Sequence, residues 1–357
     1  MSTLLDAGTP APPALAERTA AVIAGRRRRE RRRAAVTAIL AIAIIGVFVV
    51  SLMVGKSFYG LDEVARVILG ETVPGASFTV GELRLPRASL AVLAGFAFGV
   101  AGVTFQTMLR NPLASPDIIG ITSGASAAAV FGIVVLSLSE TLVSLLAVAG
   151  ALATALAIYL LSNKGGFAGT RLILIGIGVA AMLDAAVTYI LSKAAVWDLQ
   201  SAMRWLTGSL NGATWSIVVP LAVASAILVP ILLAQSRGLG VMRIGDDAAA
   251  GLGVRLNVTR VIAIVAAVTL LAFATAATGP IAFVAFMAGP IAARIVGPGG
   301  SLLLPSGLVG ALLVLVADLL GQFAFDSRYP VGVVTGVLGA PYLIYLLIRT
   351  NRSGGSL

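Results

Sequence analysis

The chain of 357 residues contains neither cysteine nor histidine. Without cysteine there are no disulfides and no thiolate chemistry. Without histidine there is no imidazole metal ligand and no histidine acid–base catalysis. Only carboxylates and carbonyl oxygens remain as metal ligands, and we assign no metal site to this chain.

Charged residues are also scarce, at 11% of the chain, whereas soluble domains carry about 25%. Hydrophobic residues make up 59%. Uncharged apolar runs of roughly 20 residues recur along the chain, and a helix of that length crosses the ~30 Å hydrocarbon core of a bilayer. The 40 glycines allow membrane helices to approach one another closely. We therefore predict an all-α, polytopic membrane protein.

The apolar runs predict about ten transmembrane helices. They cover approximately residues 34–54, 87–108, 117–138, 141–162, 172–192, 214–235, 257–278, 280–296, 302–324 and 330–348. The least marked division lies within 257–297, which we split at Thr278-Gly279-Pro280 because Gly-Pro is a strong helix breaker. An even number of spans places both termini on one side.

The basic residues predict which side that is. If both termini are cytoplasmic, the internal segments hold 18 of the 25 Lys and Arg residues, as the positive-inside rule requires. The run RRRRERRR (26–33) is then an orientation anchor, with nucleic-acid or anionic-lipid binding as alternatives. We divide the chain into a disordered basic cytoplasmic tail (1–33), a ten-helix transmembrane domain (34–350) and a cytoplasmic tail (351–357).

A polar, broken stretch, RNPLASPDIIGITSGAS (110–126), interrupts the apolar pattern. Asn111-Pro112 ends the preceding helix, because the residue before proline is disfavoured in the α region. Ser115 suits an N-cap, Pro116 the first helical position and Asp117 the positive end of the helix dipole. By itself the stretch predicts a tight helical hairpin.

The same stretch resembles the hallmark of the FecCD-type permeases, which are the membrane subunits of bacterial ABC importers for ferric siderophores, haem and cobalamin. Six further strings resemble the family in its own order. They are LRLPRASLAVLAG (83–95), RLILIGIGVAAM (171–182), MRWLTGSLNGATW (203–215), GDDAAAGLGVRLNVTR (245–260), VADLLGQ (316–322) and PVGVVTGVLGAPYLIYLL (330–347).

The resemblance implies a fold similar to cobalamin and siderophore importer permeases, with this chain forming half of a pore in the bacterial plasma membrane. It implies ABC ATPase subunits, a second permease that is identical or paralogous, and an external substrate-binding protein as partners. Ferric siderophore is the leading cargo, with haem and cobalamin behind it, and the metal travels inside its chelator. The chain has no GxxxxGK[ST] loop, so we predict a non-enzymatic subunit without cofactor, and ATP and Mg bound by the ATPase.

The resemblance also assigns residues at the external mouth. Arg84 and Arg87 match arginines that meet carboxylates on the binding protein. We favour this docking role over the alternative, in which they anchor span two at the membrane interface. Gln322 stands where the family often has a basic residue, and we expect Arg328 to supply the missing charge.

Two further sets of residues are assigned on the cytoplasmic side. Asn111 and Leu113 match positions that narrow the inner end of the pathway, and Gly169 and Thr170 match the companion gate. Gly169 departs from the family, in which a hydroxyl residue can occur. The region 241–256 matches the helix that docks on the ATPase, through Gly245, Asp246, Asp247, Ala250, Gly251, Leu252 and Gly253.

Two acids lie within predicted spans, Asp184 and Asp318. Intramembrane carboxylates are functional candidates, and Asp318 matches the family's Ala-Asp pair. Such acids would also suit the alternative of an ion-coupled secondary transporter. An intramembrane enzyme is excluded, because two separated acids form no catalytic constellation.

Overall fold

The computed structural model describes residues 15–117, 119–162 and 169–352, and all regular structure in these ranges is helical. One helix corresponds to each predicted span. In chain order these are α1 (Leu15–Met53), α3 (Leu85–Met108), α4 (Ile121–Val134), α5 (Glu140–Ser162), α6 (Gly169–Lys193), α8 (Trp215–Ala234), α11 (Leu256–Thr278), α12 (Val284–Val296), α13 (Leu303–Phe323) and α14 (Val331–Arg352). The shorter elements connect them: α2 (Leu61–Ile68), the π-helix η1 (Ser77–Arg84), α7 (Val196–Leu206), α9 (Ser236–Met242) and α10 (Asp246–Gly251).

Eight spans in the described ranges are long and apolar enough to cross a membrane, which confirms a polytopic membrane protein. The other two predicted spans form shorter helices, α4 with 14 residues and α12 with 13. At 1.5 Å per residue these are about 20 Å long, against ~30 Å of hydrocarbon. Each is completed by irregular chain, over 109–117 and 119–120 before α4 and over 279–283 before α12.

The start of α4 differs from its prediction. The sequence predicts a helix beginning at Ser115 to Asp117, but these residues form turns, and α4 begins only after Gly120. Gly120 has φ 87° and lies against the backbone of Gly176. A left-handed residue interrupts a right-handed helix, so the helix starts one turn later. The predicted break at Thr278-Gly279 is confirmed, because α11 ends at Thr278 and Gly279 has φ 71°.

The start of α1 also differs. The sequence predicts a disordered tail through residue 33, but α1 is helical from Leu15 and includes the arginine run. Arg32 donates to the carbonyl oxygen of Ile295 at 3.0 Å, and Arg33 donates to those of Gly299 and Ser301. The last carbonyls of a helix lack intrahelical donors. These two arginines therefore stabilise the end of α12 and the loop that leads to α13, beyond any role in orientation.

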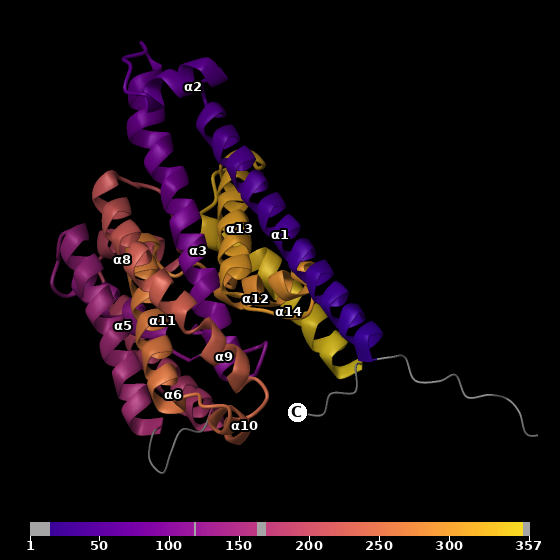
Figure 1. Ribbon diagram of the computed structural model, residues 1–357. Helices are drawn as coiled ribbons and strands as arrows, with labels where there is room; N and C mark the ends of the chain where they lie inside the picture. Colours follow the sequence, from indigo (N-terminus) through magenta and orange to yellow (C-terminus); the bar gives the residue numbers. More distant parts are fainter. Residues whose placement is uncertain (1–14, 118, 163–168, 353–357) are drawn as a thin grey trace, which may run out of the picture.

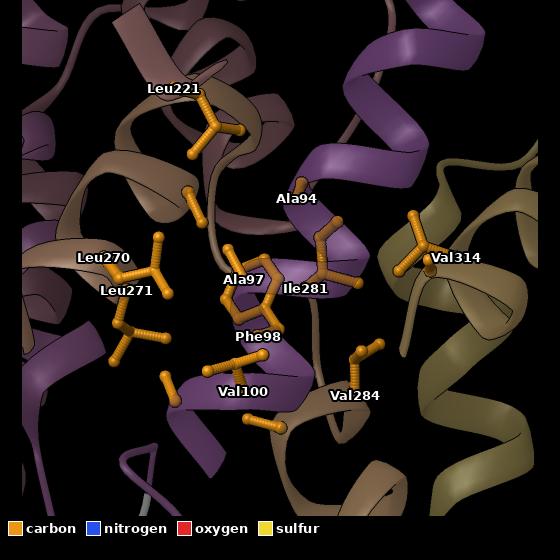
Figure 2. Close-up of a cluster of buried hydrophobic side chains, with 14 of the residues drawn as sticks. Ala94, Ala97, Phe98, Val100, Leu221, Leu270, Leu271, Ile281, Val284 and Val314 are labelled. Atoms are coloured by element: carbon orange, nitrogen blue, oxygen red, sulfur yellow. The ribbon is translucent and has the colours of Figure 1, made fainter. Parts of the chain in front are cut away.

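The buried centre of the bundle is α3, which packs against α13, α11, α12 and α8. Figure 2 shows Phe98 of α3 among Leu270 and Leu271 of α11, with Val284 of α12 and Val314 of α13 nearby. Close approach to α13 depends on glycines four residues apart, Gly95 and Gly99. A Cβ at Gly99 would overlap the carbonyl oxygen of Ser306. Small residues at this spacing let membrane helices pack backbone to backbone.

The two ends of the bundle differ in their connections (Figure 1). The helix α2 lies at one end, which we call the α2 end, and α9 and α10 lie at the other, the α10 end. The first residues of α1 and the last residues of α14 both lie toward the α10 end. This arrangement agrees with an even number of crossings.

The glycine packing of α3 predicts a stability difference between two Gly→Ala substitutions. Gly99→Ala should lower the free energy of unfolding by about 1–3 kcal/mol, because the added methyl group forces α3 and α13 apart. Gly178→Ala on α6, where a Cβ meets nothing within 4 Å, should be neutral or slightly stabilising. Thermal unfolding of the purified protein in detergent measures both. Equal midpoints would show that α3 does not require glycine at this position.

Candidate functional site

The predicted gate residues lie mostly in one cavity at the α10 end of α3 and α6. This gate cavity of about 250 Å³ is lined by Asn111, Gly169 and Thr170, together with Asp246 and Arg260. Leu113 is not among its lining residues. The structure thus brings together two sets that the sequence predicts separately, because Asp246 comes from the predicted coupling region.

The gate begins at the C-terminus of α3, which closes with a Schellman arrangement. The N–H of Asn111 donates to the carbonyl oxygen of Gln106 at 3.1 Å, and that of Arg110 donates to Thr107 at 3.3 Å. Arg110 has φ 52°, the left-handed position that glycine usually occupies in this motif. For a residue with a side chain that conformation costs roughly 1–2 kcal/mol. The arginine is therefore held in a strained conformation beside the cavity.

Local contacts shape the rest of the gate. The side-chain oxygen of Asn111 accepts from the N–H of Leu113 at 2.9 Å, an Asx-type turn. A Cβ at Gly169 would lie 3.0 Å from Leu109 Cδ2, so a larger residue would require Leu109 to move. The contact is with the end of a flexible side chain, so a small movement of Leu109 would accommodate a residue larger than glycine.

The predicted coupling segment forms the short helix α10. Gly245 precedes it with φ 117° and Gly253 follows it with φ 84°, and both are conformations that favour glycine. Asp247, Ala250, Gly251 and Leu252 are exposed, and Leu252 retains 68% of its accessible surface. An exposed leucine beside exposed small residues leaves this side of α10 open to a partner.

Asp246, the first residue of α10, forms ion pairs with two arginines from different helices. One carboxylate oxygen accepts from Arg110 and the other from Arg260 of α11. Burial acts to raise the pKa of Asp246, but the hydrogen bonds and positive charges of Arg260 and Arg110 outweigh it and lower the pKa. Asp246 is therefore ionised across the physiological pH range. Its pair with Arg110 is about 40% exposed on both sides, and such a pair contributes roughly 0.2–1 kcal/mol.

At the α2 end, Arg84 holds the C-terminus of α1. It donates to the carbonyl oxygens of Leu52 and Met53 at 2.8 and 2.9 Å, and to that of Ser57 at 2.6 Å. The ring of Tyr59 lies under its guanidinium, 5.0 Å from the ring centroid. These contacts correspond to the anchoring interpretation of Arg84.

Arg87 is paired with one of the two intramembrane acids. Its guanidinium donates to both carboxylate oxygens of Asp318 on α13, at 2.9 and 2.7 Å, and to Asn211 at 2.7 Å. Gln322 donates to the same carboxylate at 2.8 Å. The side chains of Arg87 and Asp318 are only 20% and 7% exposed. Asp318 thus bonds to a neighbouring helix. No local pattern in the sequence indicates this partner, because 231 residues separate the two.

Arg328 differs from the other two arginines. It is exposed in the loop between α13 and α14 and, within the described part of the chain, makes no side-chain hydrogen bond or ion pair. Of the three predicted docking residues, it alone has its guanidinium uncommitted. Docking itself remains a prediction for all three.

Asp184 lies on an exposed face of α6. It follows Ile173 and Ile177 at spacings of eleven and seven residues, which places the three on one side of the helix. Ile173 lines the gate cavity. A carboxylate facing acyl chains is costly, so this side of α6 faces water or protein.

A second cavity, missed in the sequence, lies between the two irregular segments. This central cavity of about 340 Å³ is lined on one side by Ser115, Asp117 and Thr122, and on the other by residues 280–283 and Phe286. Phe283 has φ 63°, which is strained for an aromatic residue. The feature of the sequence that lies at this cavity is the Gly279-Pro280 break, which by itself predicts only a boundary between spans.

A sequence profile of the FecCD transport family matches residues 41–349 of this chain. The chain belongs to the FecCD transport family. The resemblance stated from the sequence is thereby confirmed over most of the chain.

Individual members of the FecCD family match along nearly their whole length. The chain is 41% identical over 313 residues to an achromobactin transport system permease protein of Dickeya dadantii, covering 87% of this chain and 90% of that protein. It is 40% identical over 299 residues to the ferric enterobactin transport system permease protein of Escherichia coli, covering 82% and 88%. A metal-chelate type ABC transporter solved in an inward-facing conformation superposes with a TM-score of 0.79 at 26% identity, covering 88% and 98%.

The ion pair of Arg87 with Asp318 predicts that Arg87 stabilises the fold. Arg87→Gln or Asp318→Asn should lower the free energy of unfolding by roughly 3 kcal/mol, because each leaves a buried charge without its partner. The double substitution should cost less than the sum of the two. Chemical or thermal unfolding in detergent gives these values.

Arg328→Gln is the matched control, since this exposed arginine should change stability by less than about 0.5 kcal/mol. If Asp318→Asn proved as stable as the Arg328 variant, the pair would not hold α3 to α13.

Proposed function

We propose that this chain is the permease subunit of an ATP-driven ABC importer for ferric siderophores in the bacterial plasma membrane. Membership of the FecCD family and the superposition on a metal-chelate type ABC transporter support this assignment. Ferric enterobactin, named for one relative, indicates the class of cargo. The α10 end is then cytoplasmic, in agreement with the distribution of Lys and Arg.

The observation that carries the proposal is the central cavity between two helices too short to span. Irregular backbone at membrane depth is tolerated where it is buried in protein or lines a cavity. Here both irregular segments contribute to one cavity that contains Asp117. Substrate sites near the bilayer midplane are typically formed by interrupted helices of this kind.

A second permease subunit follows from the exposed surfaces. The central cavity of about 340 Å³ is at the lower limit of small-molecule pockets, so a bulky chelate requires the matching cavity of a partner. The side of α6 that carries Asp184 faces water or protein. Both features are satisfied when α6 and the central cavity face a second permease across the pore.

The two ends of the bundle suit the remaining partners. The exposed face of α10 at the cytoplasmic end presents Leu252 and small residues to an ATPase subunit. Arg328 at the external end presents a free guanidinium to carboxylates of a substrate-binding protein, where ion pairs steer and orient the encounter. The alternative of an ion-coupled transporter loses support, because Asp318 is occupied by Arg87.

Reconstitution tests the proposal directly. The permease, its ATPase and its binding protein are placed in proteoliposomes, and uptake of ⁵⁵Fe-labelled siderophores is measured with ATP and with an ATPase-inactive variant. We expect uptake that requires ATP hydrolysis and persists when an ionophore collapses ion gradients. Uptake abolished by the ionophore and indifferent to ATP would establish secondary transport instead. Labelled haem and cobalamin in parallel test the cargo class.

Cysteine labelling tests the gate. Because the native chain has no cysteine, single cysteines at 111, 169 and 170 report without background. Their rates of maleimide labelling from the cytoplasmic side should differ between nucleotide-free and ATP-trapped complexes, since a gate occupies two states. Ala125→Cys, at a position only 1% exposed, should stay protected in both. Identical rates at all three gate positions would assign Asn111 a turn-forming role alone.

A further inference from the structure

Asp246 belongs both to α10 and to the lining of the gate cavity. It is the first residue of α10, and its carboxylate lines the gate cavity beside Asn111 and Thr170. One oxygen contacts Arg110, adjacent to the gate residue Asn111, and the other contacts Arg260 in the second turn of α11. A single side chain thus joins the element open to the ATPase with the loop that borders the pathway.

The two ion pairs differ in their surroundings. The side chain of Arg260 is 8% exposed, whereas that of Arg110 is 40% exposed. Water reaches the buried guanidinium of Arg260 poorly, so its contact with Asp246 is not readily exchanged for water. The half-exposed pair is exchanged for water at little cost. Asp246 therefore stays with Arg260, while its contact with Arg110 is the one that can open.

The backbone of Arg110 is also strained. The strain of its left-handed conformation is at least as large as the contribution of the half-exposed ion pair. Glycine would adopt φ 52° without strain, so the arginine side chain destabilises the helix C-terminus. The Schellman motif does not require a guanidinium at this place. Because both contributions are small, the loop can change between two states at little cost.

We propose that Asp246 is the positioning residue through which α10 sets the gate loop. It remains bound to Arg260 and makes or releases Arg110 as the ATPase moves α10. This inference rests on the proposed function, and it adds Arg110 and Arg260 to the residues that couple the ATPase to the gate.

The test uses the reconstituted complex of permease, ATPase and binding protein. Asp246→Asn should raise the number of ATP molecules hydrolysed per transported cargo at least about five-fold, the lower range of coupling between sites. Asp246→Glu should restore most of the coupling. Arg110→Gln should match Asp246→Asn, and the double variant should be no worse than either, because both remove the same contact. Arg237→Gln, at an exposed arginine of α9 outside the coupling region, is the control and should couple normally.

Arg110→Gly separates coupling from structure. If Arg110 serves only the C-terminus of α3, glycine should be as stable as arginine, or more stable, and should couple normally. We expect equal or higher thermal stability together with the same five-fold loss of coupling. Normal coupling in Arg110→Gly, or in Asp246→Asn, would overturn the proposal.

Labelling of Thr170→Cys makes this result independent of cargo. In the parent complex its rate should change between nucleotide-free and ATP-trapped states. With Asp246→Asn added, that change should shrink at least about five-fold while the ATPase still co-purifies. An unaltered change would also overturn the proposal. Failure of the parent complex to take up ferric siderophores would instead refute the cargo assignment and leave this comparison intact.

Discussion

Every backbone N–H and C=O at membrane depth must find its hydrogen-bond partner inside the protein, because the bilayer core offers none. Eight long helices meet this requirement within themselves. The two exceptions, α4 and α12, are completed by irregular chain that is packed against other helices and around the central cavity. Gly120 against Gly176 shows how that packing is achieved. The central cavity lies where the chain leaves the helical conformation.

Arginine side chains stabilise this fold at several places. Arg33 and Arg84 donate to carbonyl oxygens at or just beyond helix ends, where intrahelical donors are lacking. Arg87 instead neutralises a buried carboxylate between α3 and α13. In a chain with few charges, each of these contacts ties together segments that are distant in the sequence. Among the three predicted docking residues, only Arg328 has a guanidinium without a hydrogen bond or ion pair within the described part of the chain.

The α10 end brings the predicted gate residues and the predicted coupling segment together at one cavity. Gly169 permits the start of α6 to approach Leu109, and Asp246 brings α10 to the same cavity. The pair with Arg110 is half-exposed, and the backbone of that residue is strained. A movement at the surface of α10 therefore has a short physical route to the loop that contains Asn111.

The sequence by itself determined the membrane class, ten helical segments, the family and the breaks near Pro112 and Gly279, because hydropathy, helix breakers and motif order are local properties of the chain. It predicted Asn111, Gly169 and Thr170 as neighbours only through family resemblance. Tertiary structure decided that α4 starts after Gly120, that residues 15–33 extend α1, that Arg87 pairs with Asp318 and that Asp246 joins the gate. Each of these depends on groups brought together from distant segments: a glycine against another helix, a guanidinium against a carbonyl, a carboxylate between two arginines. Such contacts have no local signature, since they exist only once the helices have packed.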